Sequence, residues 1–198
     1  MPPRPQRTPS EQIDTAVIAA ALALIDRDGA EGFTVRALAR EAGVAPMSIY
    51  NHFGDKNGVL DALWMQGYEI LATLSSTSSS DPHDNLIAGA RAYREFALTH
   101  QAHYTVMFIH RFVGYEPSAE AVYTAAKGFE VLSSQVEACQ RAGYFVGRHY
   151  VDVAQQMWAA VHGYVTTEIL GLNFASDREK VFLDFITSLV FGLSRPAP

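Results

Sequence analysis

The stretch of sequence that decides the fold runs from Phe33 to Lys56 and reads FTVRALAREAGVAPMSIYNHFGDK. Thr34 is a residue type that favours the N-cap of a helix, and Gly43 is one that favours its end. A second short helix is expected over Pro46–His52, with the proline in its first turn. Two short helices joined by a glycine turn are the pattern of a helix-turn-helix.

The two helices of this stretch divide into an apolar side and a polar side. The buried side is expected to comprise Leu38, Ala39, Val44, Ile49 and Phe53, packed on Ile13, Val17 and Leu24 of an earlier helix. The exposed side of the second helix then presents Met47, Ser48, Asn51 and His52, with Tyr50 at its flank. In a helix-turn-helix this exposed side enters the major groove of DNA, so the sequence predicts a DNA-binding surface here.

Helical spacing of apolar residues extends along almost the whole chain, and no segment alternates as a strand does. Helices are expected over about 9–28, 34–42, 46–52, 55–74, 84–100, 103–113, 117–142, 149–171 and 177–193, the first opened by a capping box at Thr8. A serine-rich stretch, 75–82, marks a boundary. The sequence therefore predicts an all-α protein of about nine helices: a flexible basic arm (1–8), a three-helix head (9–56), a connecting helix (57–76), a linker (77–83) and a helical body (84–194).

Composition and charge limit the classes of protein to consider. The chain has 198 residues, a net charge of −6 and 48% apolar residues, with no apolar run long enough to span a membrane. A single cysteine, Cys139, fits a reducing cytoplasm and is expected to be a packed thiol. Residues 1–56 contain six Lys or Arg against seven Asp or Glu. Binding to DNA would therefore depend on where the cations lie rather than on net charge.

The stretch resembles the head of the TetR family of transcriptional regulators. The resemblance lies in TVRALAREAGV at 34–44, in SIYNHFGDK at 48–56 and in Leu60, and it covers residues 9 to about 65. It implies a three-helix DNA-binding head, a larger helical body for ligand binding and dimerisation, and usually repression that a small molecule relieves. The implied partner is a pseudo-palindromic DNA operator.

The resemblance implies that Thr34, Tyr50 and Lys56 contact DNA phosphates. Their chemistry agrees, because a hydroxyl at a helix N-terminus, a phenol and an ammonium can all bind a phosphate oxygen. The alternative for Tyr50 and Lys56 is a pair that simply faces solvent at a helix junction.

A further set of residues is placed near the bases or the adjoining backbone: Arg36, Pro46, Met47, Ser48, Asn51 and His52. Asparagine pairs well with adenine, arginine with guanine, and methionine with the methyl group of thymine. Two residues depart from the family pattern. Ala45 replaces the usual Ser or Thr cap, and Met47 is bulkier than usual and could equally be a partly exposed filler.

The expected body is rich in aromatic residues, which can enclose a small apolar or aromatic molecule. The candidate ligand-binding residues are Tyr93, Phe96, Met107, Phe108, Phe112, Tyr123, Trp158 and His162. Trp158, His162 and Gly163 resemble the Trp-His-Gly signature of one TetR subgroup. The alternative is that the aromatic residues fill the core and that His162 is a buried, hydrogen-bonded histidine.

The last two expected helices carry apolar stripes that predict a two-fold, four-helix dimer interface. The stripes contain Val161, Val165 and Ile169 on one helix and Phe182, Phe185, Ile186 and Leu189 on the other. A two-fold dimer would present two recognition helices to half-sites about 34–36 Å apart. The alternative is that the stripes belong to the core of a single chain.

Nothing in the sequence indicates catalysis or a bound cofactor. His100, His103 and His110 lack acidic or cysteine partners at the spacing of a zinc site, and no serine–histidine pattern is present. The sequence therefore predicts a regulator that is not an enzyme and needs no cofactor or metal. Two alternatives remain: a regulator without a ligand, and a small-molecule carrier or enzyme that retains a non-functional head.

Overall fold

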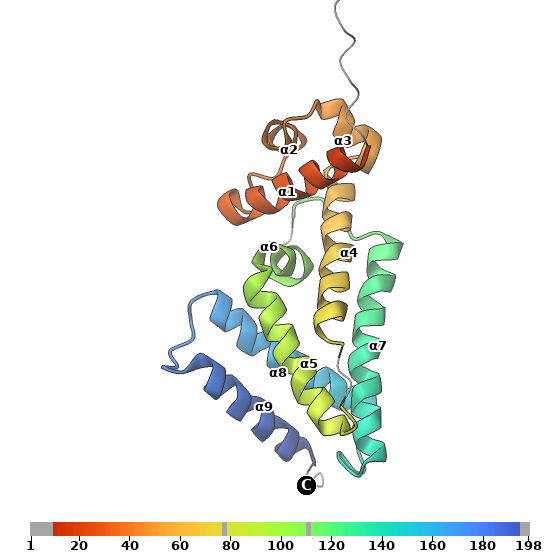
Figure 1. Cartoon of the computed structure of the whole chain (residues 1–198), viewed down its shortest axis with the longest axis vertical. Helices are drawn as coiled ribbons and strands as arrows, with labels where there is room; N and C mark the ends of the chain where they lie inside the picture. The colour runs from red at the N-terminus through yellow and green to blue at the C-terminus, as the bar shows by residue number, and fades with distance from the viewer. Residues whose placement is uncertain (1–9, 77–78, 110–111, 195–198) are drawn as a thin grey trace, which may run out of the picture. The chain divides into compact units, whose positions relative to one another are not determined.

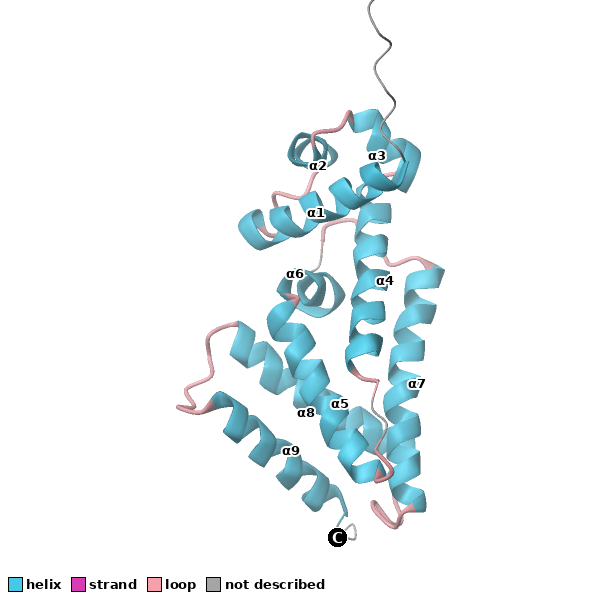
Figure 2. Cartoon of the chain, viewed as in Figure 1, coloured by secondary structure: helices cyan, strands magenta, loops and turns pink. Residues whose placement is uncertain are grey.

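The computed structural model describes residues 10–76, 79–109 and 112–194. Within these ranges the chain forms nine α-helices and one π-helical turn and contains no strand (Figure 2), so the expected all-α fold is confirmed. None of the helices in these ranges is both long and apolar enough to cross a membrane. The chain divides into two compact units, one made of residues up to Gly67 together with Ala102–Ala121, the other of Tyr68–Gln101 and the residues from Val122 onward.

The first unit contains the helix-turn-helix. Its helices, labelled in Figure 1, are α1 (Ser10–Asp28), α2 (Val35–Ala42), α3 (Pro46–Phe53), most of α4 (Lys56–Leu74) and most of α6 (Gln101–Tyr104). The π-helical turn η1 (Thr105–Ile109) follows α6. The helices α1, α2 and α3 contact one another. Thr34 caps α2 as expected, and Gly43 ends it in the left-handed conformation with a φ of 67°. The arm 1–8 and the capping box at Thr8 lie outside the described residues.

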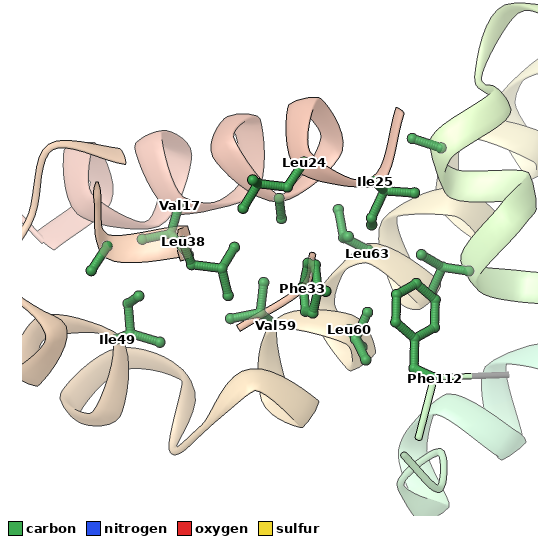
Figure 3. Close-up of a cluster of buried hydrophobic side chains, with 14 residues drawn as sticks. Val17, Leu24, Ile25, Phe33, Leu38, Ile49, Val59, Leu60, Leu63 and Phe112 are labelled. Atoms are coloured by element: carbon green, nitrogen blue, oxygen red, sulfur yellow. The ribbon is translucent and has the colours of Figure 1, made fainter. Parts of the chain in front are cut away.

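Apolar side chains from four helices meet in the core of the first unit (Figure 3). Val17 and Leu24 come from α1, Leu38 from α2, Ile49 from α3, and Val59, Leu60 and Leu63 from α4, and all seven are fully buried. Burying a side chain of this size contributes about 1.5–3 kcal/mol. The interior predicted for the helix-turn-helix is therefore present, and the start of α4 belongs to it.

The segment after α6 also belongs to the first unit, although the sequence suggested a body that runs from 84 to 194. Phe112 is buried and meets Phe33 edge-on, with ring centroids 5.5 Å apart (Figure 3). The expected single helix over 103–113 is wrong, because α6 gives way to η1 and the chain after Phe112 forms a turn. Proline at position 117 disfavours helix at the residue before it.

The second unit is a set of packed helices: α5 (Pro82–Thr99), most of α7 (Ala119–Arg141), α8 (Tyr150–Ile169), α9 (Arg178–Ser194) and the end of α4. α5 contacts α8 and α9, and these two contact each other. Phe96, Met157 and Phe182 are among the buried side chains of this unit. Cys139 is buried as expected, and burial raises the pKa of its thiol to about 11.

An ion-pair network joins three helices of the second unit. Arg94 on α5 donates two hydrogen bonds of 2.8 Å to the carboxylate of Glu168 on α8, whose side chain is only 3% exposed. The same guanidinium pairs with Glu179 on α9 at 2.5 Å. The hydrogen bonds to Glu168 raise the pKa of Arg94 further above its usual value. Removing one partner of so buried a pair would leave an uncompensated charge, so these contacts fix how the three helices pack.

Candidate nucleic-acid interface

The helix α3 presents one side to the core and the opposite side to solvent. Ile49 is fully buried, whereas Met47 is 64% exposed and Tyr50 is 49% exposed. Pro46 and Asn51 are also exposed, and Ser48 is partly so. A helix that is packed on the core through a buried isoleucine and exposed to solvent on its opposite side can enter a groove of DNA.

The N-terminus of α3 lacks a side-chain cap, as the alanine at position 45 indicated. Ala45 has extended backbone dihedral angles and makes no side-chain hydrogen bond to the helix. Its carbonyl oxygen accepts a hydrogen bond from the backbone N–H of Ser48 at 2.9 Å. The proline at the first helical position requires no hydrogen-bond acceptor, because it has no N–H.

The helix α2 carries two exposed arginines, Arg36 in its first turn and Arg40 in its last. The hydroxyl oxygen of Thr34 accepts a hydrogen bond from the N–H of Ala37 at 3.2 Å. Thr34 is exposed to solvent. Arg36 is exposed, and so is Arg40, which lies four residues later on the same side of the helix. Sequence reasoning singled out Arg36 alone. The four-residue spacing of the two arginines was the signal that could have identified Arg40.

His52 points toward α1 rather than outward. Its imidazole is only 17% exposed and donates a hydrogen bond from Nδ1 to Oδ1 of Asp14 at 2.6 Å. The expectation that His52 lies on the outward side of α3 with Met47 and Asn51 is therefore corrected. In the structure this side chain ties the C-terminal end of α3 to α1.

The helix α4 begins beside the end of α3 and carries Lys56 at its first position. Asp55 caps it as expected, since its Oδ1 accepts hydrogen bonds from the N–H groups of Asn57 at 2.7 Å and Gly58 at 3.1 Å. The ammonium of Lys56 donates to the backbone carbonyl of Val113 at 3.4 Å. Lys56 is thus partly engaged within the first unit.

Gly58 allows a close approach between α4 and the end of α3. A Cβ atom added at this position would lie 1.8 Å from the carbonyl oxygen of Phe53 and 2.9 Å from its carbonyl carbon. Both atoms belong to the backbone, which cannot move aside as a side chain can. Gly58 is therefore needed for the present angle between the two helices, a role that sequence reasoning missed.

Of the five expected ligand-binding residues that lie in the second unit, four are buried or partly buried. The hydroxyl of Tyr93 on α5 and Nδ1 of His162 on α8 share a hydrogen bond of 3.0 Å. Trp158 stacks on the imidazole of His162, with ring centroids 5.2 Å apart. Burial lowers the pKa of His162, so its imidazole is neutral at pH 7. Phe96 is fully buried in the same unit.

The other four expected ligand-binding residues are divided between the two units. Met107, Phe108 and Phe112 belong to the first unit, where Phe112 fills the core of the head. Tyr123 is 63% exposed on α7, and the ammonium of Lys127 lies 5.4 Å from the centre of its ring. Phe112 is therefore a core residue of the first unit, and Tyr123 lies at the surface of α7.

The apolar stripes of α8 and α9 face the interior of the second unit. Val161, Val165, Phe182 and Ile186 are buried within the single chain, and Ile169, Phe185 and Leu189 are partly buried. The four buried residues cannot contact a partner without opening the unit, so assigning them to a dimer interface is corrected. The exposed large apolar residues at the end of α8, on α9 and between them are Leu170, Leu172, Phe174, Val181 and Phe191.

The described histidines that were considered for a metal site do not belong to a cluster of potential metal ligands. No group of three or more His, Cys, Asp or Glu side chains comes together in the described ranges as a metal ion would require. His103 is buried and donates from Nε2 to Oε1 of Gln66 at 2.9 Å. His110 lies outside the described residues.

Two family models match the chain. The model described as bacterial regulatory proteins of the tetR family matches residues 17–63. The model described as the tetracyclin repressor-like C-terminal domain matches residues 86–189. The two matches together cover the head and most of the second unit.

Relatives with curated names and solved structures agree with these matches. The chain is 27% identical over 191 residues to an HTH-type transcriptional regulator of Mycobacterium tuberculosis, covering 94% of this chain and 84% of the relative. Over 90 residues it is 36% identical to the class A tetracycline repressor protein of Escherichia coli, covering 43% of this chain and 40% of the relative. A TetR-family transcriptional regulator of Thermus thermophilus shares the fold, with a TM-score of 0.71 at 17% identity over 90% of this chain and 99% of that one.

We expect Gly58→Ala to destabilise the protein by roughly 1–3 kcal/mol, because the new methyl group must displace the backbone of Phe53. The matched control is Gly89→Ala, since Gly89 also lies within a helix but its added Cβ would meet only the flexible end of the Gln135 side chain, at 3.1 Å. The control should raise stability by up to about 1 kcal/mol, as alanine favours the helix. Denaturant unfolding of both variants measures the difference, and equal stabilities would contradict a backbone clash at Gly58.

Proposed function

The chain belongs to the TetR family of DNA-binding transcriptional regulators, and on that premise we propose that it is a dimeric repressor released from its operator by a small apolar or aromatic ligand. The observation that carries the DNA-binding part is the geometry of α3, in which Ile49 is fully buried while Met47 and Tyr50 are exposed. The homologues and the fold are those of regulators rather than of enzymes. Membership of the Trp-His-Gly subgroup stays a prediction.

Phosphate contacts in the proposed complex come from residues around α3. Tyr50 is half-exposed and has a hydroxyl that suits a phosphate oxygen. Thr34 lies at the exposed N-terminus of α2, where backbone N–H groups favour anions. Lys56, Arg36 and Arg40 place positive charge near the same helices, although the head as a whole is close to neutral.

Base contacts in the proposed complex come from the exposed side of α3. Met47 is the most exposed apolar side chain of the helix and can meet the methyl group of a thymine. Asn51 is exposed one turn later and can pair with adenine. Ser48 and Pro46 lie at the helix start and complete the surface. His52 contributes by fixing α3 to α1 through Asp14.

The proposed dimer uses the outer side of α8 and α9. Phe191 is 68% exposed and Val181 is 40% exposed on α9, and Leu170 is 56% exposed at the end of α8. Gly163 on α8 and Gly192 on α9 have open space around the position of a Cβ, so a second helix can approach closely there. Exposed apolar side chains beside small residues fit a two-fold helical interface.

The proposed ligand contact is the polar group formed by Tyr93, His162 and Trp158. The phenol of Tyr93 is bonded to the imidazole of His162, on which the indole of Trp158 stacks, so polar and aromatic groups lie together there. A small aromatic or apolar molecule with one polar end matches that chemistry. Release would require the ligand to bind the DNA-free state more tightly than the DNA-bound state.

We expect the double variant Tyr50→Phe with Lys56→Ala to weaken binding to an operator recovered by selection from random duplex DNA, by on the order of tenfold or more. The slope of log K against the logarithm of the salt concentration should become less steep by about 2 for a dimer, because each subunit loses the charge of one lysine. The matched control is Tyr123→Phe with Lys127→Ala, an exposed pair on α7. A carrier or enzyme with a non-functional head would select no duplex, or would bind equally well in all forms.

We expect Phe191→Glu to shift the protein toward monomer and to lower its affinity for a full operator toward that for a half-site, because a buried carboxylate without a partner opposes association. Val146→Glu is the matched control, as Val146 is 69% exposed against 68% for Phe191 and lies between α7 and α8. Sedimentation equilibrium measures the state of both variants. A dimer that survives Phe191→Glu would place the interface elsewhere.

We expect His162→Leu to abolish the rise in melting temperature that ligands produce, because the polar end of the site is lost. The probe is a panel of small aromatic acids, phenols and apolar esters, screened by thermal shift on the wild-type protein. His83→Leu is the matched control, since His83 is also stacked on an aromatic ring, that of Tyr144. Compounds that bind should also lower affinity for the full operator, and an unchanged affinity would refute ligand-controlled release.

A further inference from the structure

We propose that the segment Phe112–Ser118, here named the clasp, positions Lys56 for its DNA phosphate by holding the first turns of α4 through Tyr115 and Asp61. The clasp follows η1 and precedes α7, far from the helix-turn-helix in sequence but in the same compact unit. The inference rests on the proposed DNA contact of Lys56. It adds to that contact a set of positioning residues outside the helix-turn-helix.

The clasp binds the first two residues of α4 through backbone carbonyl groups. Lys56 donates from Nζ to the carbonyl oxygen of Val113 at 3.4 Å. Asn57 donates from Nδ2 to the carbonyl oxygen of Gly114 at 3.3 Å. Two successive side chains of α4 therefore use two successive carbonyl groups of the clasp. A long lysine side chain held in this way loses less conformational entropy when its ammonium meets a phosphate.

The clasp is fixed to α4 by one carboxylate that accepts two hydrogen bonds. Oδ1 of Asp61 accepts from the hydroxyl of Tyr115 at 2.8 Å and from the backbone N–H of Ser118 at 3.2 Å. Burial and the neighbouring Asp61 carboxylate raise the pKa of Tyr115 well above its usual range, so the phenol stays protonated and remains a donor. The ring of Tyr115 also lies 6.5 Å from that of Trp64.

The other end of the clasp is anchored in the core of the head. Phe112 is only 4% exposed and packs among residues that also hold α1 and α4, including Ile25 and Leu60. Its ring meets Phe33, the residue directly before the cap of α2. The clasp is thus anchored at Phe112 in the core and at Tyr115, which is bonded to Asp61 of α4. The carbonyl groups of Val113 and Gly114 lie between these two anchors in sequence.

These contacts separate positioning from direct binding. Tyr115 and Asp61 are engaged with each other, so their effect on DNA must pass through the placement of α4 and of Lys56. Because α4 already packs closely on the backbone of Phe53 at Gly58, a change in the clasp is expected to shift the Lys56 side chain rather than the junction with α3. Loss of the clasp bond should therefore matter only while Lys56 is present.

The test is a double-mutant cycle on the selected operator duplex, with the full-length protein. We expect Tyr115→Phe to weaken binding by up to about tenfold, the loss that follows when Lys56 no longer reaches its phosphate, and to lower the salt dependence as Lys56→Ala does. In the Lys56→Ala background, Tyr115→Phe should cause no further loss. The matched control is Tyr164→Phe, which removes a phenol that donates to the carbonyl of Arg178 in the second unit.

A second pair of variants separates positioning from folding. Asp61→Asn keeps an oxygen acceptor for Tyr115 and should retain wild-type affinity, whereas Asp61→Ala should match Tyr115→Phe. Melting temperatures of all variants are measured alongside. The inference would be overturned if Tyr115→Phe lowered DNA affinity equally with and without Lys56. It would also be overturned if Tyr115→Phe left DNA affinity unchanged while Lys56→Ala lowered it. Either result would leave the proposed function intact. A wild-type protein that selects no duplex would overturn both.

Discussion

Burial of Ile49 against α1, α2 and α4 is the contact on which the rest of the first unit depends. An eight-residue helix such as α3 is too short to be stable alone, so its helical state is maintained by tertiary packing. The fully buried isoleucine fixes the rotation of α3 about its axis, and that rotation decides which side chains reach solvent. Met47 and Tyr50 are exposed because Ile49 is not.

The direction of α3 is fixed at its two ends by different interactions. At the start, Pro46 requires no acceptor, which compensates for the missing side-chain cap at Ala45. At the end, His52 is bonded to Asp14 of α1, and Gly58 lets α4 pass close to the carbonyl of Phe53. Apolar packing thus sets the rotation of the helix about its axis. The hydrogen bond between His52 and Asp14, together with the glycine at position 58, sets the angle of α3 to the neighbouring helices.

Charge has different uses in the two units. In the second unit, Arg94 and Glu168 are withdrawn from solvent and lock helices together, which requires that both partners be present. In the first unit, Arg36 and Arg40 remain exposed, although the head as a whole is close to neutral. The proposed DNA surface therefore depends on a few accessible cations on α2 rather than on an overall positive charge.

The sequence by itself determined the all-α fold, the helix-turn-helix, the cap at Thr34, the turn at Gly43 and the burial of Leu38 and Ile49, because these follow from local propensity and helical periodicity. Tertiary structure alone decided that Phe112 fills the core of the head, that His52 turns toward Asp14, and that Val161 and Phe182 face their own chain. Periodicity shows that a helix has an apolar side, but it cannot show which partner covers that side. Only the packing of residues distant in sequence decides that, as the pairing of Arg94 with Glu168 illustrates.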